Sequence, residues 1–153
     1  MKAKYILGIF IVLLIATTAC AYAAEQTIGD KYKFTVPDGY NVYEANSENV
    51  TLTNDSKHVI TIVTTNFLNS EDVLVKSLEK AGSKVQDHHT FKYGGKDIRE
   101  IDYKDDGYNL NMYSWDMGSN EYIIIIVVCP SDETAAKWEA SPAKTIFDTM
   151  TRK

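Results

Sequence analysis

The chain has 153 residues, of which 44% are hydrophobic and 24% charged, values typical of a globular protein and not of a disordered one. Its net charge of −5 argues against nucleic acid as a partner, because an acidic surface repels phosphate groups. It has only two cysteines, Cys20 and Cys129, and their contexts argue against an intramolecular disulfide.

Residues 1–23 have the layout of a secretory signal peptide. Lys2 and Lys4 make the start positive, a nearly unbroken apolar run follows, and the small residues "AYA" end the segment as a cleavage site. We therefore expect cleavage after Ala23. Loss of the two lysines would take the net charge from −5 to −7.

Two other fates of this leader remain open. The apolar run would stay as an N-terminal membrane anchor, although it is shorter than the ~20 residues that a span prefers. Alternatively "TTAC" would be a lipobox that carries lipid on Cys20, although Thr17 stands where leucine is usual. All three fates predict one domain, residues 24–153, that is extracytoplasmic: secreted, or tethered to the outer face of the cytoplasmic membrane.

The next segments alternate polar and apolar residues, which predicts half-buried strands. A strand over residues 27–36 ends at the turn "PDG" (37–39), where proline presets φ and glycine tolerates a positive φ. A second short strand begins at Tyr40. Residues 49–54 and 58–65 then form a hairpin.

Residues 70–82 change to a helical period. Ser70 is a suitable N-cap, and Gly82 can end the helix. Leu74 and Leu78 fall on one stripe, which requires a surface to cover it.

Strand patterns then resume and predict an antiparallel meander of four strands: 84–93, 96–104, 108–117 and 121–129. The turns between them carry glycine, as tight hairpins require: Gly94-Gly95, Asp105-Asp106-Gly107 and Gly118-Ser119-Asn120. The last strand, "EYIIIIVVC", is apolar on both faces, so we expect it at the centre of the sheet with cover on both sides.

Ser131 is expected to open the last helical region, which Pro142 interrupts, either as a kink or at the first turn of a second helix. The chain as a whole therefore predicts an α+β domain, an antiparallel β-sheet flanked by helices on both faces.

One stretch carries a family resemblance. "FTVPDGY" (34–40) ends a strand with an aromatic-x-x-Pro-x-Gly-aromatic pattern near the expected mature N-terminus, and this resembles the Mog1/PsbP-like family, many members of which have tryptophan at the position of Tyr40. The order that follows is also similar: a helix, a "YGGK" hairpin (93–96), a meander, and a terminal helix with Phe147. The resemblance covers residues 27–152 and implies a Mog1/PsbP-like α/β/α sandwich. It also implies a non-catalytic accessory or binding domain that engages a protein partner at the cell surface, although no functional residue of the family can be matched here.

An alternative is a small-ligand or metal-binding module. Asp87 and His89 share a strand face, whereas His88 points to the other face, and His58 would join the pair to hold Zn²⁺ or Cu²⁺. Histidines exposed to solvent on the surface explain the same pattern.

Glu100 and Asp102 are a pair of carboxylates of the kind that catalysis uses, but they fit a solvent-exposed strand face equally well.

No sequence motif of hydrolases, P-loop proteins or zinc proteases is present, so we expect neither an enzyme nor a cofactor, with an unrecognised hydrolase as a second alternative.

Asn49 and Asn54 begin N-x-[ST] triplets and would be glycan acceptors in an exported protein. Four aromatic residues on consecutive strands either pack beneath the helices or form an exposed patch for a partner: Tyr103, Tyr108, Tyr113 and Trp115. We expect a monomer.

Overall fold

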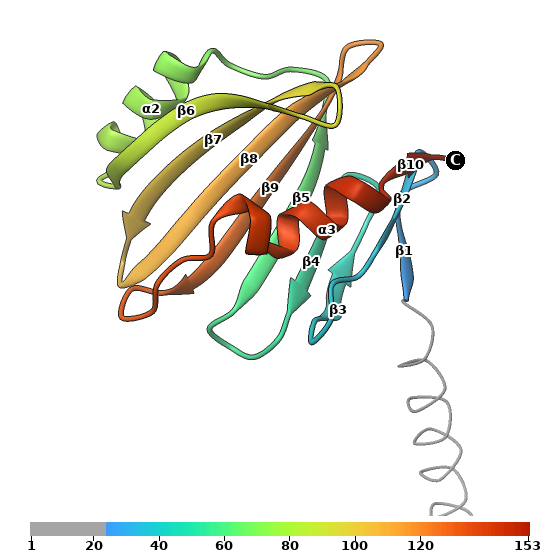
Figure 1. Ribbon diagram of the computed structural model, residues 1–153, viewed down its shortest axis with the longest axis horizontal. Coiled ribbons are helices and arrows are strands. Elements are labelled where there is room, and N and C mark those ends of the chain that lie inside the picture. Colours follow the sequence, from blue (N-terminus) through green and yellow to red (C-terminus); the bar gives the residue numbers. More distant parts are fainter. Residues whose placement is uncertain (1–23) are drawn as a thin grey trace, which may run out of the picture.

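The computed structural model describes residues 24–153, and the expected leader, including Cys20, lies outside them. Within this range a seven-stranded antiparallel sheet runs in the order β3-β4-β5-β9-β8-β7-β6 (Figure 1). Its strands are β3 (Asn41–Ala45), β4 (Asn49–Thr53), β5 (Val59–Thr65), β6 (Lys84–Tyr93), β7 (Lys96–Asp105), β8 (Tyr108–Gly118) and β9 (Glu121–Pro130). The four-strand meander is confirmed, with ends that agree to within one residue.

The first strands form a separate small sheet. It consists of β1 (Glu25–Ile28), β2 (Tyr32–Thr35) and the C-terminal β10 (Thr151–Arg152), in the order β1-β2-β10. The prediction of one strand over residues 27–36 was wrong, because the chain reverses at Gly29. This glycine has a φ of +53°, and a Cβ on it would lie 2.8 Å from the carbonyl oxygen of Ser47.

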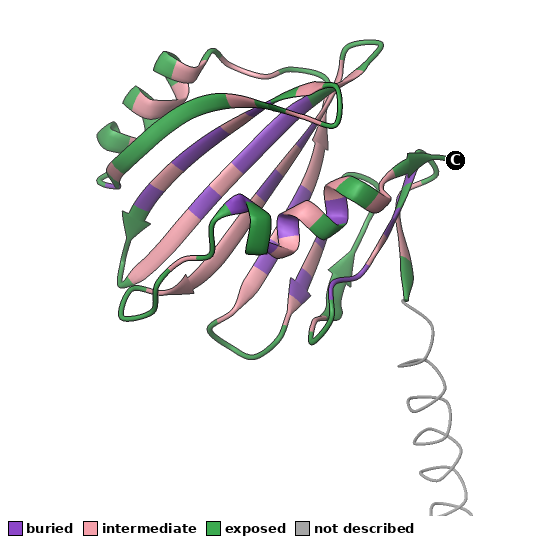
Figure 2. Cartoon of the chain, viewed as in Figure 1, coloured by how far each residue is buried: buried purple, intermediate pink, exposed green. Residues whose placement is uncertain are grey.

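The isoleucine-rich strand lies in the middle of the large sheet, as predicted. β9 pairs with β5 on one side and with β8 on the other, and Ile125 lies opposite Ile62 and Tyr113. These three side chains are fully buried (Figure 2). They share one core with residues of the small sheet, such as Phe34, and with Ile146.

This buried face is covered by the small sheet, by the 3-10 helix η1 (Trp138–Ala140) and by α3 (Pro142–Thr149). Aromatic rings join the layers: the Phe147 ring lies 4.9 Å from the ring of Trp115 and 5.9 Å from that of Trp138, both near perpendicular. Phe147, expected late in a terminal helix, therefore anchors α3 to the sheet.

α2 (Glu71–Lys80) begins and ends where the sequence predicts. The Oγ of Ser70 accepts a hydrogen bond from the backbone N–H of Val73, at 3.4 Å. After the last turn Gly82 adopts a φ of +97°, the left-handed conformation that commonly follows a helix.

α2 lies on the opposite face of the sheet, over its β6 edge. Glu71 contacts Nδ1 of His88 at 2.9 Å, and Arg99 donates to the carbonyl of Asn69 at 2.6 Å. None of the ten residues of α2, all within the described range, is fully buried. Along β5, β8 and β9 this face presents half-buried apolar side chains: Val59, Val63, Leu110, Met112, Ile124, Ile126 and Val128.

Helices therefore lie on both faces, but they do not cover them equally. The central strand is tightly covered on the α3 side and only in part on the α2 side, so the domain is richer in sheet than the expected α/β/α sandwich.

The last helical region begins later than predicted. Residues 131–137 form no helix, because the carbonyl of Glu133 accepts a hydrogen bond from the side chain of Asn109, at 2.8 Å, instead of closing a helical turn. Pro142 is the first residue of α3, as expected, and the Oγ of Ser141 caps the helix by accepting from the N–H of Ala143, at 3.2 Å.

The β6–β7 turn gives a stability prediction. Gly94 and Gly95 both have a positive φ, but a Cβ on Gly94 would lie 2.7 Å from the ring of Phe147, whereas one on Gly95 meets no described atom within 4 Å. We expect Gly94→Ala to lower the free energy of unfolding by about 1–3 kcal/mol more than Gly95→Ala does, because only Gly94→Ala forces α3 from the turn. Denaturant unfolding of the two variants measures this difference, and equal losses would contradict it.

Candidate functional site

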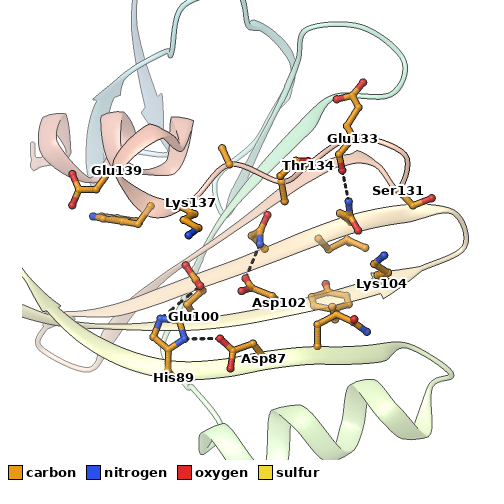
Figure 3. A pocket seen from close by; sticks show the side chains of 18 of the residues that line it. Asp87, His89, Glu100, Asp102, Lys104, Ser131, Glu133, Thr134, Lys137 and Glu139 are labelled. Carbon is orange, nitrogen blue, oxygen red and sulfur yellow. Dashed lines mark hydrogen bonds and ion pairs between the residues drawn. The ribbon is translucent and has the colours of Figure 1, made fainter.

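A cavity of about 710 Å³ lies on the covered face of the sheet, between strands β6, β7 and β8 and the segment 131–139 (Figure 3). We call it the β6–β8 pocket, and its floor and wall include six side chains: Asp87, His89, Glu100, Asp102, Asn111 and Trp138. Its size falls within the range of pockets that hold small ligands.

Strand register brings the polar residues together. His89 on β6 pairs with Glu100 on β7, and Asp87 pairs with Asp102, which pairs in turn with Asn111 on β8. A bulge between Val85 and Asp87 shifts the register of β6, so that the side chain of Asp87 faces the pocket.

The ring of His89 lies between two carboxylates. Its Nδ1 is 3.3 Å from Asp87 Oδ2, and its Nε2 is 3.7 Å from Glu100 Oε2. One carboxylate oxygen of Asp102 accepts a hydrogen bond of 2.6 Å from the amide of Asn111.

Glu100 is the most unusual group of the pocket. Only 8% of this residue is exposed, and burial, followed by the negative charge of Asp102, raises the pKa of its carboxyl to about 7. Its single ion pair within the described residues is the 3.7 Å contact with His89, which is too long for a hydrogen bond. The expectation that Glu100 lies on a solvated strand face was therefore wrong.

Beside Glu100, the hydroxyl of Tyr113 is fully buried and has no hydrogen-bond partner among residues 24–153. Burial and the Glu100 charge raise its pKa. The indole N–H of Trp138, a residue 7% exposed, likewise has no partner in the described part of the chain. Unsatisfied buried polar groups are uncommon, and of these two residues Trp138 lines the pocket.

The opposite wall of the pocket is aromatic. The ring of Trp138 lies 5.4 Å from that of Phe91, edge to face, and 5.1 Å from that of Tyr113. The pocket thus combines an acidic floor with an aromatic wall.

The structure brings together two of the three predicted metal ligands. Asp87 and His89 are adjacent, as alternation along the strand predicts. His58 is not part of the described lining of the pocket: it precedes β5 and contacts Asp55 at 2.9 Å and Glu133 at 2.7 Å. Hydrogen bonds to Glu133 and then Asp55 raise its pKa.

Between residues 24 and 153, no group of three or more His, Cys, Asp or Glu side chains converges closely enough to hold a metal ion. His88, as expected, points to the other face. Metal binding through Asp87 and His89 stays a prediction.

The other predicted positions are separate from the pocket. Asn49 is half-buried at the start of β4, where its side chain accepts a hydrogen bond from Asn46, and Asn54 is exposed in the β4–β5 turn. Glycosylation at both stays a prediction. Tyr113 and Trp115 pack beneath the helices, 0% and 2% exposed, Tyr103 is 6% exposed and Tyr108 is half-buried, so the four form no exposed patch.

Sequence reasoning missed Glu100, Asp102, Asn111 and Trp138 as parts of one site. A signal was available for Glu100 and Asp102: alternation along β7 places them on the same strand face as Ile98, which is fully buried. Trp138 gave no such signal, because η1 is a single short turn that no periodicity of the sequence marks.

Within the described residues, no helix has the length and apolar character needed to cross a membrane. No family model and no curated protein sequence matches the chain.

Among solved structures, the chain is similar to cyanobacterial PsbP (CyanoP) of Synechocystis sp. PCC 6803. The identity is 12% and the TM-score 0.56, over 86% of this chain and 94% of that protein. The chain also matches a protein of Bacteroides thetaiotaomicron at 14% identity and a TM-score of 0.48. This match covers 83% of the present chain and 49% of the Bacteroides protein. The fold of residues 24–153 is therefore PsbP-like.

Proposed function

We propose that this chain is a non-catalytic, extracytoplasmic binding domain of PsbP-like type, and that it binds a small ligand in the β6–β8 pocket. The observation that carries the proposal is the pocket itself, which combines about 710 Å³ of space with an aromatic wall and the buried, unsatisfied indole N–H of Trp138. Small-molecule sites have this character: largely apolar, with a few convergent polar groups.

The pocket is better suited to binding than to catalysis. Both ring nitrogens of His89 face carboxylates, so this histidine has no hydroxyl or thiol to activate among its described contacts. A nucleophile and its base are expected within hydrogen-bond reach of each other.

The extracytoplasmic location is supported by the signal-peptide pattern of residues 1–23. N-terminal sequencing of the protein from the native organism tests it: a mature chain beginning near Ala24 is expected. A protein partner at the cell surface remains part of the proposal, supported by the family resemblance. The buried Tyr113 and Trp115 are not available as its docking surface.

Ligand binding is tested with a panel of small cations, anions and neutral compounds, scored by the rise in the melting temperature of the protein. Ala136, in the described lining, allows a blocking variant: Ala136→Trp would fill the mouth of the pocket. Ala81→Trp, at an exposed site that ends α2, is the matched control. We expect hits that stabilise the wild type and Ala81→Trp but not Ala136→Trp.

A panel with no hit, or hits that Ala136→Trp retains, would overturn the proposed function.

A further inference from the structure

We propose that the ligand of the β6–β8 pocket is an organic cation, an ammonium compound with an apolar or aromatic group. Its charged nitrogen would lie against Glu100 and Asp102, and its apolar part against Trp138 and Phe91. The inference rests on the proposed function, since it names the ligand class of the same pocket.

The first argument is charge. Of the described residues that line the pocket, five are acidic and two are lysines, Lys104 and Lys137. The acidic residues are Asp87, Glu100, Asp102, Glu133 and Glu139. A cation offsets the repulsion between the neighbouring carboxylates on the floor, whereas an anion would add to it.

The second argument is the unmet hydrogen bonding of the floor, which is independent of the number of acids. The Glu100 carboxylate is nine-tenths buried, and its contact with His89 is 3.7 Å long. Buried carboxylates are normally hydrogen-bonded, and an ammonium group brings up to three N–H donors to this point.

The geometry disfavours a bare metal ion as the cation. The carboxylates and His89 do not converge on one point within the described structure, as a metal requires. Figure 3 shows Asp87, Glu100 and Asp102 side by side along the floor, with His89 between two of them. An ammonium group needs only two such acceptors.

The third argument is the aromatic wall. Trp138 and Phe91 meet edge to face at 5.4 Å, and both rings line the pocket. Aromatic faces attract cations and cover the apolar part of a ligand, so the wall complements the acidic floor.

Three probes of similar shape separate the ligand classes: benzylammonium, benzyl alcohol and benzoate, each titrated into the protein by calorimetry. We expect benzylammonium to bind most tightly, with an affinity that weakens as salt rises from about 50 mM to about 500 mM. Asp102→Asn should weaken its binding roughly tenfold, since a charge-assisted hydrogen bond is lost. Asp97→Asn removes the same charge from β7 at an exposed site paired with Lys92, and should leave the affinity about unchanged.

The outcomes are distinguishable. If benzyl alcohol or benzoate binds more tightly than benzylammonium, and Ala136→Trp blocks that binding, the proposal of a cationic ligand is overturned. The pocket would then still be a ligand site. Equal affinity of Asp102→Asn and wild type for benzylammonium would also overturn it. Binding of Zn²⁺ that His89→Ala abolishes and that excludes benzylammonium would assign the pocket to a metal. No binding by the probes or by any compound of the panel would overturn the proposed function as well.

Discussion

Alanine in place of Ile125 is expected to lower the free energy of unfolding by about 2–5 kcal/mol. Ile125 is fully buried at the centre of β9, between Ile62 and Tyr113 on the neighbouring strands. The substitution loses the burial of three carbons and leaves a cavity, because strands paired on both sides do not collapse to fill it. Denaturant unfolding followed by tryptophan fluorescence measures the loss.

Ile126 is the matched control, since it is the next residue of the same strand and points to the other face, where it is half-buried. Ile126→Ala should cost less than half as much as Ile125→Ala. Equal losses would show that the α2 side is packed as tightly as the α3 side, against the structure.

Replacing Glu100 with glutamine is expected to stabilise the protein at about pH 8 and not at about pH 4.5. Burial and Asp102 raise the pKa of Glu100 from 4.5 to about 7 in the folded protein. Between these values the folded state keeps a proton that the unfolded state releases, so the free energy of unfolding falls as pH rises and levels off above about pH 7. Glutamine carries no charge and removes this loss.

The shift corresponds to roughly 3–4 kcal/mol at high pH, at about 1.4 kcal/mol for each pKa unit. The ionisable groups that face Glu100 are Asp102, His89 and Tyr113. The measurement is the difference in unfolding free energy between variant and wild type across pH 4.5 to 8, in which the titration of distant groups cancels.

Glu79→Gln, on the exposed side of α2, makes the same change in net charge away from the pocket and serves as the control. A difference for Glu100→Gln that does not vary with pH would mean that Glu100 is solvated and that its carboxyl is ionised in both states.

The parts of the fold that local chemistry determines could be predicted from the sequence. Gly94 and Gly95 adopt the positive φ that their turn requires, Ser70 caps α2, and Pro142 opens α3. The unbroken apolar character of β9 indicated its central position, because side chains on both faces of a sheet are most covered in its middle.

The parts that depend on distant contacts could not be predicted. Residues 131–137 have the composition of a helix start, but Asn109 takes the carbonyl that a helix would use. Gly29 is tightly packed against Ser47, a contact that nothing in the pattern of residues 27–36 reveals.

The same limit applies to the site. Alternation placed Asp87 and His89 on one face, but the burial of Glu100 depends on the segment 131–139, which folds over β7 from elsewhere in the chain. Burial therefore separates Glu100 from an ordinary surface acid, and burial is a tertiary property.

The small sheet ties the beginning of the domain to its end. Thr151 pairs with Lys33, and the N–H of Lys153 donates to the carbonyl of Lys31, at 2.9 Å. Strand β2 therefore has β1 as one partner strand and gains the other, β10, from residues near the C-terminus. Removal of residues 151–153 would therefore leave β2 with β1 as its single partner strand and open one edge of the small sheet to solvent, while the pairings of the seven-stranded sheet stay complete.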